Sequence, residues 1–230
     1  MAATVMTVAQ QKGGAGKSTL AIHLAVAWSA LGKRVAIVDI DPQASVSQWD
    51  ERRGQAHNGN GHAKNGNGNG HANGHAEAAE LPHVVKLSGW RTVNEVERLG
   101  REHDIVIIDS PPHAATESRI AVRAAKLVIV PMQPSVMDLW ATQATLDMAK
   151  AERVPALVVL NRVPARSRAA DEVAAEVATL GVPMADARIG NRVALASALH
   201  RGKGITEYEA SSTAAQEIAA LAQEILGRVS

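Results

Sequence analysis

A glycine-rich segment near the N-terminus constrains most strongly what this chain can fold into. It reads QQKGGAGKST at positions 10–19 and lies between a β-branched run, Thr4–Ala9, and a helical pattern, Lys17–Leu31. Glycines let a backbone fold tightly around phosphate oxygens, so that successive N–H groups point inward. The helix that follows presents its positive end to the same oxygens. The sequence therefore predicts a phosphate-binding loop between a strand and a helix.

Strand and helix patterns alternate along the rest of the chain. Short β-branched runs occupy Thr4–Ala9, Arg34–Asp39, His83–Leu87, Asp104–Asp109, Leu127–Pro131 and Ala156–Asn161. Helical patterns occupy Lys17–Leu31, Ala44–Arg53, Arg91–Gly100, Thr116–Ala125, Met137–Arg153, Arg168–Leu180 and about Ser212–Leu226. Such alternation predicts parallel strands joined by right-handed crossovers. We therefore expect one three-layer α/β domain over residues 1–230, with a mostly parallel sheet and helices on both faces.

A segment of small and polar residues interrupts this domain at 54–76. Its 23 residues include 7 Gly, 6 Asn, 4 His and 4 Ala, and no large apolar side chain. Such a segment cannot bury enough surface to offset its ordering entropy, so we expect a flexible surface loop. Metal capture by His57, His62, His71 and His75 is the alternative, although the spacing of these histidines is irregular.

Composition excludes several classes of site and of protein. The chain contains no cysteine, which excludes disulfides, zinc–cysteine sites, iron–sulfur clusters and a cysteine nucleophile. No apolar run approaches the length of a membrane span, and residues 1–10 lack the pattern of a secretory signal. We therefore expect a cytoplasmic protein. The net charge of +1 neither indicates nor excludes nucleic acid as a partner.

Two further strands are predicted to end in acidic residues. Val35–Asp39 continues into Asp41-Pro-Gln, and the apolar run Ile105–Asp109 continues into Ser-Pro-Pro. Carboxylates at the C-terminal ends of strands face the crevice in which open α/β sheets bind ligands. An apolar strand that ends in aspartate, here Asp109, is typical of the Mg²⁺ site of phosphate-loop ATPases.

The glycine-rich loop itself assigns roles to its side chains. In loops of this type the lysine, here Lys17, contacts the β- and γ-phosphates of ATP, and the hydroxyl that follows, Ser18, coordinates Mg²⁺. We expect the nucleotide phosphates to be bound by Lys12, Gly13, Gly14, Ala15, Gly16, Lys17, Ser18 and Thr19. The general pattern requires glycine at position 11, where this chain has Gln11 and then a second lysine, Lys12.

This departure matches K-G-G-x-G-K-[ST], the deviant Walker A motif. Together with D-x-D-P-Q at 39–43, D-x-P-P at 109–112 and Asn-Arg at 161–162, it resembles the ParA/MinD family of ATPases. The resemblance extends over about residues 3–225, apart from the 54–76 insert. It implies an ATP-sandwich dimer in which Lys12 reaches the phosphates of the partner subunit. Its other implied roles are water orientation by Asp41, a place near the metal for Asp39, and a hydrogen bond from Asn161 to adenine.

Missing features narrow the choice among branches of the family. The branches that use cysteines are excluded, and the tyrosine cluster of bacterial autokinases is absent because Tyr208 stands alone. MinD-type ATPases end in a basic amphipathic membrane helix, whereas 217–228 is acidic to neutral and is expected to pack on the domain. The phosphate loop begins near residue 11, so we expect no helix-turn-helix domain before it. The chain most resembles short ParA-like ATPases, which position a cargo on the nucleoid.

That branch implies three partners: a second copy of the chain in the presence of ATP, double-stranded DNA bound without sequence preference, and a ParB-like or cargo-adaptor protein that stimulates hydrolysis. Basic side chains neutralise DNA phosphates without reading bases. The candidates in the basic stretch 186–205, part of which resembles the DNA-contacting region of the family, are Arg188, Arg192, Arg201 and Lys203. A second basic cluster contains Arg162, Arg166 and Arg168.

Two other functions stay open at this point. One is a MinD-like ATPase on a membrane surface that regulates division or flagella, without membrane insertion. The other is a nucleotide-gated scaffold with negligible turnover. The sequence does not identify the cargo, which could be a plasmid, a chromosome region, a carboxysome or a chemoreceptor cluster.

Overall fold

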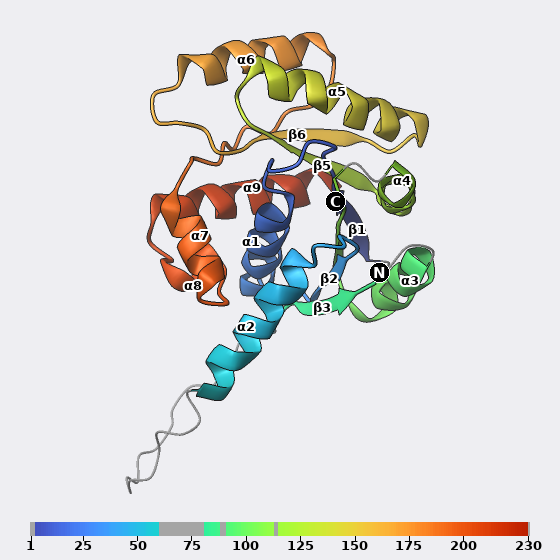
Figure 1. Cartoon of the computed structure of the whole chain (residues 1–230), viewed down its shortest axis with the longest axis vertical. Coiled ribbons are helices and arrows are strands. Elements are labelled where there is room, and N and C mark those ends of the chain that lie inside the picture. Colours follow the sequence, from blue (N-terminus) through green and yellow to red (C-terminus); the bar gives the residue numbers. More distant parts are fainter. Residues whose placement is uncertain (1–2, 60–80, 88–90, 113–114, 230) are drawn as a thin grey trace, which may run out of the picture.

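A computed structural model describes residues 3–59, 81–87, 91–112 and 115–229. The strands are β1 (Thr4–Val8), β2 (Val35–Asp39), β3 (His83–Lys86), β4 (Ile105–Asp109), β5 (Leu127–Met132) and β6 (Ala156–Leu160). The helices are α1 (Lys17–Ala30), α2 (Ser45–Gly59), α3 (Thr92–Glu102), α4 (Ala115–Ala124), α5 (Val136–Ala151), α6 (Arg168–Thr179), α7 (Val193–His200), α8 (Ile205–Tyr208) and α9 (Thr213–Val229) (Figure 1).

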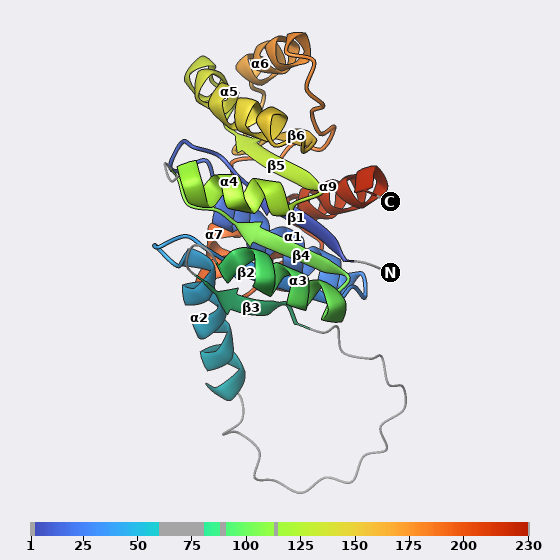
Figure 2. The same cartoon turned by 90° about the vertical axis from the view of Figure 1, so that its right-hand side faces the viewer.

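The six strands form one parallel sheet in the order β3-β2-β4-β1-β5-β6. Helices α1, α2, α7, α8 and α9 pack against one face, and α3, α4, α5 and α6 against the other. Figure 2 shows α3 and α4 in front of the sheet and α1 and α9 behind it. Every residue of β2, β4 and β5 is buried, as expected for strands covered on both faces. The predicted three-layer α/β fold is confirmed.

The register of the central strands brings their last residues to the same edge of the sheet. Asp39 of β2 lies opposite Asp109 of β4, and Asp109 lies opposite Val8 of β1. The glycine-rich loop follows β1 directly. Because parallel strands end at a common edge, the loop and both acidic strand ends meet there.

The structure departs from the sequence expectations at three places. Helix α2 continues through Gly59, six residues into the segment 54–76 that we expected to be a loop. Helices α7 and α8 were not predicted at all. The remainder of the insert, with His62, His71 and His75, lies outside the described residues, so the metal alternative is untested.

The C-terminal helix α9 packs on the domain, as the sequence predicted. Its apolar side chains, among them Ile218 and Leu221, are fully buried, and Trp28 Nε1 of α1 donates a hydrogen bond of 2.9 Å to the Ala222 carbonyl. None of the helices formed by the described residues is long and apolar enough to cross a membrane.

Candidate nucleotide site

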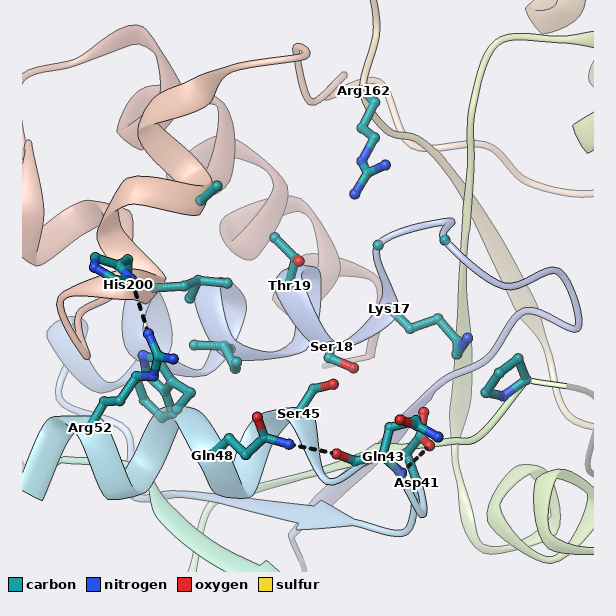
Figure 3. A pocket seen from close by; sticks show the side chains of 17 residues that line it. Lys17, Ser18, Thr19, Asp41, Gln43, Ser45, Gln48, Arg52, Arg162 and His200 are labelled. Carbon is teal, nitrogen blue, oxygen red and sulfur yellow. Dashed lines mark hydrogen bonds between the residues drawn. The ribbon is translucent and has the colours of Figure 1, made fainter.

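A cavity of about 580 Å³ opens at the C-terminal edge of the sheet. The glycine-rich loop and the start of α1 form one wall, and the segment Asp41–Ser45 and the polar face of α2 form another. Helix α7 and Arg162 close its outer side (Figure 3). The predicted phosphate loop and the predicted strand-end carboxylate Asp41 therefore line the same space.

Two glycines give the loop its shape. Gly14 and Gly16 have φ angles of 79° and 88°, in the left-handed region that favours glycine. Gly16 is also the residue that precedes α1, so the N–H groups of the first turn of this helix are directed toward the cavity end of the loop. A Cβ atom on Gly16 would lie only 2.5 Å from Asn161 Nδ2, so a side chain there would displace Asn161.

Lys17 is the buried cation of this site. Its side chain is buried, and Figure 3 shows Lys17, Ser18 and Asp41 around the same part of the cavity. Burial lowers the pKa of Lys17 below its usual value, and the carboxylates of Asp109 and Asp41 oppose that shift. A buried ammonium beside a loop of inward N–H groups can bind an anion such as phosphate.

Asp109 has the chemistry of a metal ligand. It is fully buried, and neither carboxylate oxygen has a hydrogen-bond partner among the described residues. Burial raises the pKa of Asp109 to about 7, opposed by the neighbouring Ser18 hydroxyl and reinforced by Asp39. The described residues contain no cluster of three or more histidine or acidic side chains that could bind a metal alone. A divalent cation here would therefore need oxygens from a nucleotide, as Mg²⁺ commonly does.

The two acids at the end of β2, Asp39 within the strand and Asp41 after it, have different surroundings. Asp39 is fully buried, and its Oδ2 accepts hydrogen bonds from Ser47 N at 2.9 Å and Ser47 Oγ at 2.7 Å. Its Oδ1 accepts a bond of 3.2 Å from Asp41 N. Asp39 therefore positions the start of α2, and its predicted place near a metal stays a prediction. Asp41 borders the cavity, and its Oδ1 accepts one bond of 2.9 Å from Gln43 N.

Asn161 lies at the end of β6, against the loop. Its Nδ2 donates a hydrogen bond of 2.9 Å to the Ala15 carbonyl, and its Oδ1 accepts one of 3.0 Å from Arg162 N. Both ends of the amide thus hold the loop and the following turn together, while the adenine contact stays a prediction. Arg162 has a φ of 53° and lines the cavity, although the sequence grouped it with a surface cluster.

Lys12 is the only residue of the predicted phosphate set that we expected to act on a second subunit. In this chain its Nζ lies 2.8 Å from Asp138 Oδ2 at the start of α5. The Lys12 side chain is 39% exposed, whereas that of Asp138 is 4% exposed. The exposed lysine is therefore held by a buried carboxylate of its own chain.

The four predicted DNA contacts differ in their partners: two of them form ion pairs with carboxylates, and the other two do not among the described residues. Arg188 forms an ion pair of 2.6 Å with Asp171 of α6, and Arg192 forms a two-pronged pair with Glu217 of α9. Arg201 and Lys203 lie beyond the end of α7 and are exposed. The structure does not bring these four residues into one unpaired surface.

Several cavity residues were missed by the sequence analysis. Gln43 ends the D-x-D-P-Q motif and could have been found from it, but Gln48, Arg52 and His200 carried no signal. They reach the cavity because α2 and α7 pack side by side, which is a tertiary contact between segments about 150 residues apart.

Comparisons with known proteins agree with this geometry. The family model of the ATPase MipZ matches residues 4–154. The chromosome-partitioning ATPase Soj of Thermus thermophilus is 31% identical over 238 residues, covering 97% of this chain and 96% of that protein. The maintenance of carboxysome distribution protein A of Halothiobacillus neapolitanus is 26% identical over 233 residues, covering 97% of each.

Solved structures share the fold. The MinD cell division protein of Aquifex aeolicus has a TM-score of 0.75 at 20% identity, covering 98% of this chain and 97% of that one. An ATP complex of McdA from Cyanothece has a TM-score of 0.74 at 17% identity, covering 98% and 96%. With the family model spanning well over half of its residues, this chain belongs to the MipZ family of ATPases.

Proposed function

We propose that this ATPase positions a cargo on the nucleoid. Two subunits close over two ATP molecules, the resulting homodimer binds double-stranded DNA without sequence preference, and a ParB-like or cargo-adaptor protein stimulates hydrolysis and release. The observation that carries the ATP-dependent part is the burial of Lys17 and Asp109 beside the left-handed glycines of the loop, with neither Asp109 carboxylate oxygen hydrogen-bonded among the described residues.

The residues of the site divide the work of hydrolysis. The N–H groups of Gly13–Thr19 and the Lys17 ammonium bind the β- and γ-phosphates. Ser18 and Asp109 would hold Mg²⁺, which would offset the charge that develops on the phosphate oxygens. Asp41 borders the cavity with one carboxylate oxygen bound to Gln43 N and orients the attacking water. Such catalysis consists mainly of positioning and charge stabilisation.

Lys12 links the nucleotide to dimerisation. To reach the phosphates of a partner subunit it must leave Asp138, so the triphosphate has to attract Lys12 more strongly than that carboxylate does. A diphosphate carries less charge and competes less well. Hydrolysis would therefore return Lys12 to Asp138 and open the dimer.

The functions given for two relatives support the positioning role. Soj is a chromosome-partitioning ATPase, and protein A of Halothiobacillus neapolitanus maintains carboxysome distribution. A membrane-surface function has less support, because the apolar side chains of α9 are buried against the domain. The cargo of this chain is accordingly a plasmid, a chromosome region or a protein complex.

The test combines ATP turnover with DNA binding. The parent protein should hydrolyse ATP slowly and should bind unrelated duplexes about equally, only with ATP. Lys17→Ala should lose ATP binding and, with it, DNA binding. Absence of DNA binding together with ATP-dependent binding to anionic liposomes would replace this proposal by the membrane-surface function. Absence of turnover under all conditions would favour the scaffold.

A further inference from the structure

Four basic side chains from segments distant in sequence gather beside the nucleotide cavity. Arg52 projects from α2, and His200, Arg201 and Lys203 lie at the end of α7 and just beyond it. All four are exposed, and Arg52 Nη1 lies 3.0 Å from His200 Nδ1 (Figure 3). We call this group the α2–α7 basic surface.

The cations of this surface are not neutralised. In the described part of the chain, Arg52, Arg201 and Lys203 form no ion pair with a carboxylate. Arg188 and Arg192, in contrast, each have an acidic partner. A cation that already has a carboxylate partner releases fewer counterions when it meets DNA, because the phosphate must compete with that partner. The unpaired cations are the better phosphate contacts.

A buried arginine fixes the backbone on which this surface stands. The Arg53 side chain is 5% exposed and donates hydrogen bonds to both carboxylate oxygens of Glu207, at 3.0 and 2.6 Å. It also donates to the Gly202 carbonyl at 3.3 Å and lies 5.0 Å from the centre of the Trp49 ring. Trp49 Nε1 donates to the Lys203 carbonyl at 3.3 Å. The loop after α7 is therefore fastened to α2.

Gly202 brings this loop into direct contact with the helix. Its φ is +66°, and a Cβ atom there would lie 2.6 Å from both Cα and N of Arg53. Buried Gly202 thus faces α2, while the side chains on either side of it, Arg201 and Lys203, are exposed. Cations held on a fixed backbone bind phosphates with little loss of conformational freedom.

We infer that the α2–α7 basic surface, rather than Arg188 and Arg192, contacts the phosphates of duplex DNA. The inference rests on the proposed function and names its DNA-contacting residues, of which Arg52 and His200 had no signal in the sequence. The ligand is the phosphate backbone, because exposed cations neutralise phosphates without reading bases, whereas the neighbouring aromatic side chains Trp49 and Tyr208 are buried and half-buried.

The test is a fluorescence anisotropy titration of the full chain with ATP, using two unrelated duplexes at several salt concentrations. Arg201→Ala and Lys203→Ala should each weaken binding to both duplexes alike and lower the salt dependence by about one unit of slope. Arg188→Ala is the matched control, since it removes an exposed arginine that has a carboxylate partner, and it should bind nearly as the parent does. Light scattering with ATP first establishes that every variant dimerises.

Three results would decide against the assignment. If Arg201→Ala and Lys203→Ala bind DNA like the parent while Arg188→Ala or Arg192→Ala binds weakly, the DNA face lies near α6 and α9. If the variants lose binding to phosphatidylglycerol vesicles but not to DNA, the surface serves a membrane. If the parent itself binds no duplex, the proposed function fails as well. If Lys203→Arg binds DNA like the parent while Lys203→Ala does not, the result would support a phosphate contact over a structural role.

Discussion

Lys12 Nζ lies 2.8 Å from Asp138 Oδ2 within the same chain. The same carboxylate oxygen accepts a bond of 2.6 Å from Ser135 Oγ, and the Asp138 side chain is almost completely buried. A buried carboxylate requires a partner, whereas an exposed lysine does not. The contact therefore matters more to Asp138 than to Lys12, and it opposes any movement of Lys12 toward a second subunit.

Releasing this contact should favour dimerisation. Asp138→Asn keeps a group that can bond to Ser135 but removes the charge that attracts Lys12, so the variant should dimerise at a lower ATP concentration than the parent. Lys12→Ala should bind ATP as a monomer yet dimerise weakly. Light scattering during an ATP titration measures both effects.

Asp147→Asn is the matched control for that experiment, because it makes the same change on the exposed side of α5, where Asp147 Oδ1 accepts a hydrogen bond of 2.9 Å from Gln143. It should dimerise like the parent. Equal ATP dependence for Asp138→Asn and the parent would show that Asp138 does not compete for Lys12. A Lys12→Ala protein that dimerises normally would contradict the role of Lys12 itself.

Substitution of Asp39 and of Asp41, the two acids at the end of β2, should have different effects. Asp41→Ala should bind ATP, dimerise and stall, because this carboxylate borders the cavity and has a single backbone partner. Asp39→Ala should instead lower the free energy of unfolding by about 1–3 kcal/mol, since it removes two hydrogen bonds from half-buried Ser47 to a charged, buried carboxylate. Nucleotide binding, turnover and urea unfolding of both variants give the comparison. An Asp41→Ala protein that fails to bind ATP would assign that residue to the metal or to structure.

Shortening the insert should change stability and ATP turnover little if the deletion begins after the end of α2. Deletion of 60–76 leaves α2 intact through Gly59 and should change the melting temperature little, because loop length affects stability only weakly. Basal ATP turnover should persist. A large fall in melting temperature on deletion, or on adding a chelator to the intact chain, would instead indicate a structural or metal-binding insert.

His23 should make stability depend on acid pH. Its Nδ1 accepts a hydrogen bond of 3.1 Å from Ile205 N, and burial lowers the pKa of His23 to about 4 from a usual value of 6.5, against small opposing effects of the Leu195 backbone and Glu207. The folded state therefore prefers neutral His23. Its contribution, on the order of 3 kcal/mol, is complete above about pH 6.5 and is lost as the pH falls toward 4.

Urea unfolding at pH 7.5 and pH 4.5 measures this effect. The parent should lose more stability between the two values than His23→Gln, in which an amide oxygen can accept the same bond but cannot titrate. Identical pH dependence in the two proteins would mean that His23 is not the group that titrates.

The sequence predicted those parts of the fold that local patterns encode. All six strands and the glycine-rich loop were predicted, because apolar runs and clustered glycines are signals contained within a few consecutive residues. Helices α7 and α8 were missed because they are short and their positions depend on distant contacts, such as Gly204 against Val26 and Ile205 N on His23. Sequence spacing also could not tell that Asp39 caps a helix, or that acids of α6 and α9 neutralise Arg188 and Arg192.

Strands β1, β2 and β4 end in register, and this register restricts where residues can be inserted or deleted. Asp39 and Asp109 are paired in register on the neighbouring strands β2 and β4, and loss of one residue within either strand would turn every side chain beyond it to the opposite face. We therefore expect insertions and deletions within these strands to displace the acidic side chains from the site. Helix α2 ends at Gly59, outside these strands. A fluorescent protein or an affinity tag is therefore better inserted after Gly59, the last residue of α2, than within any of these strands.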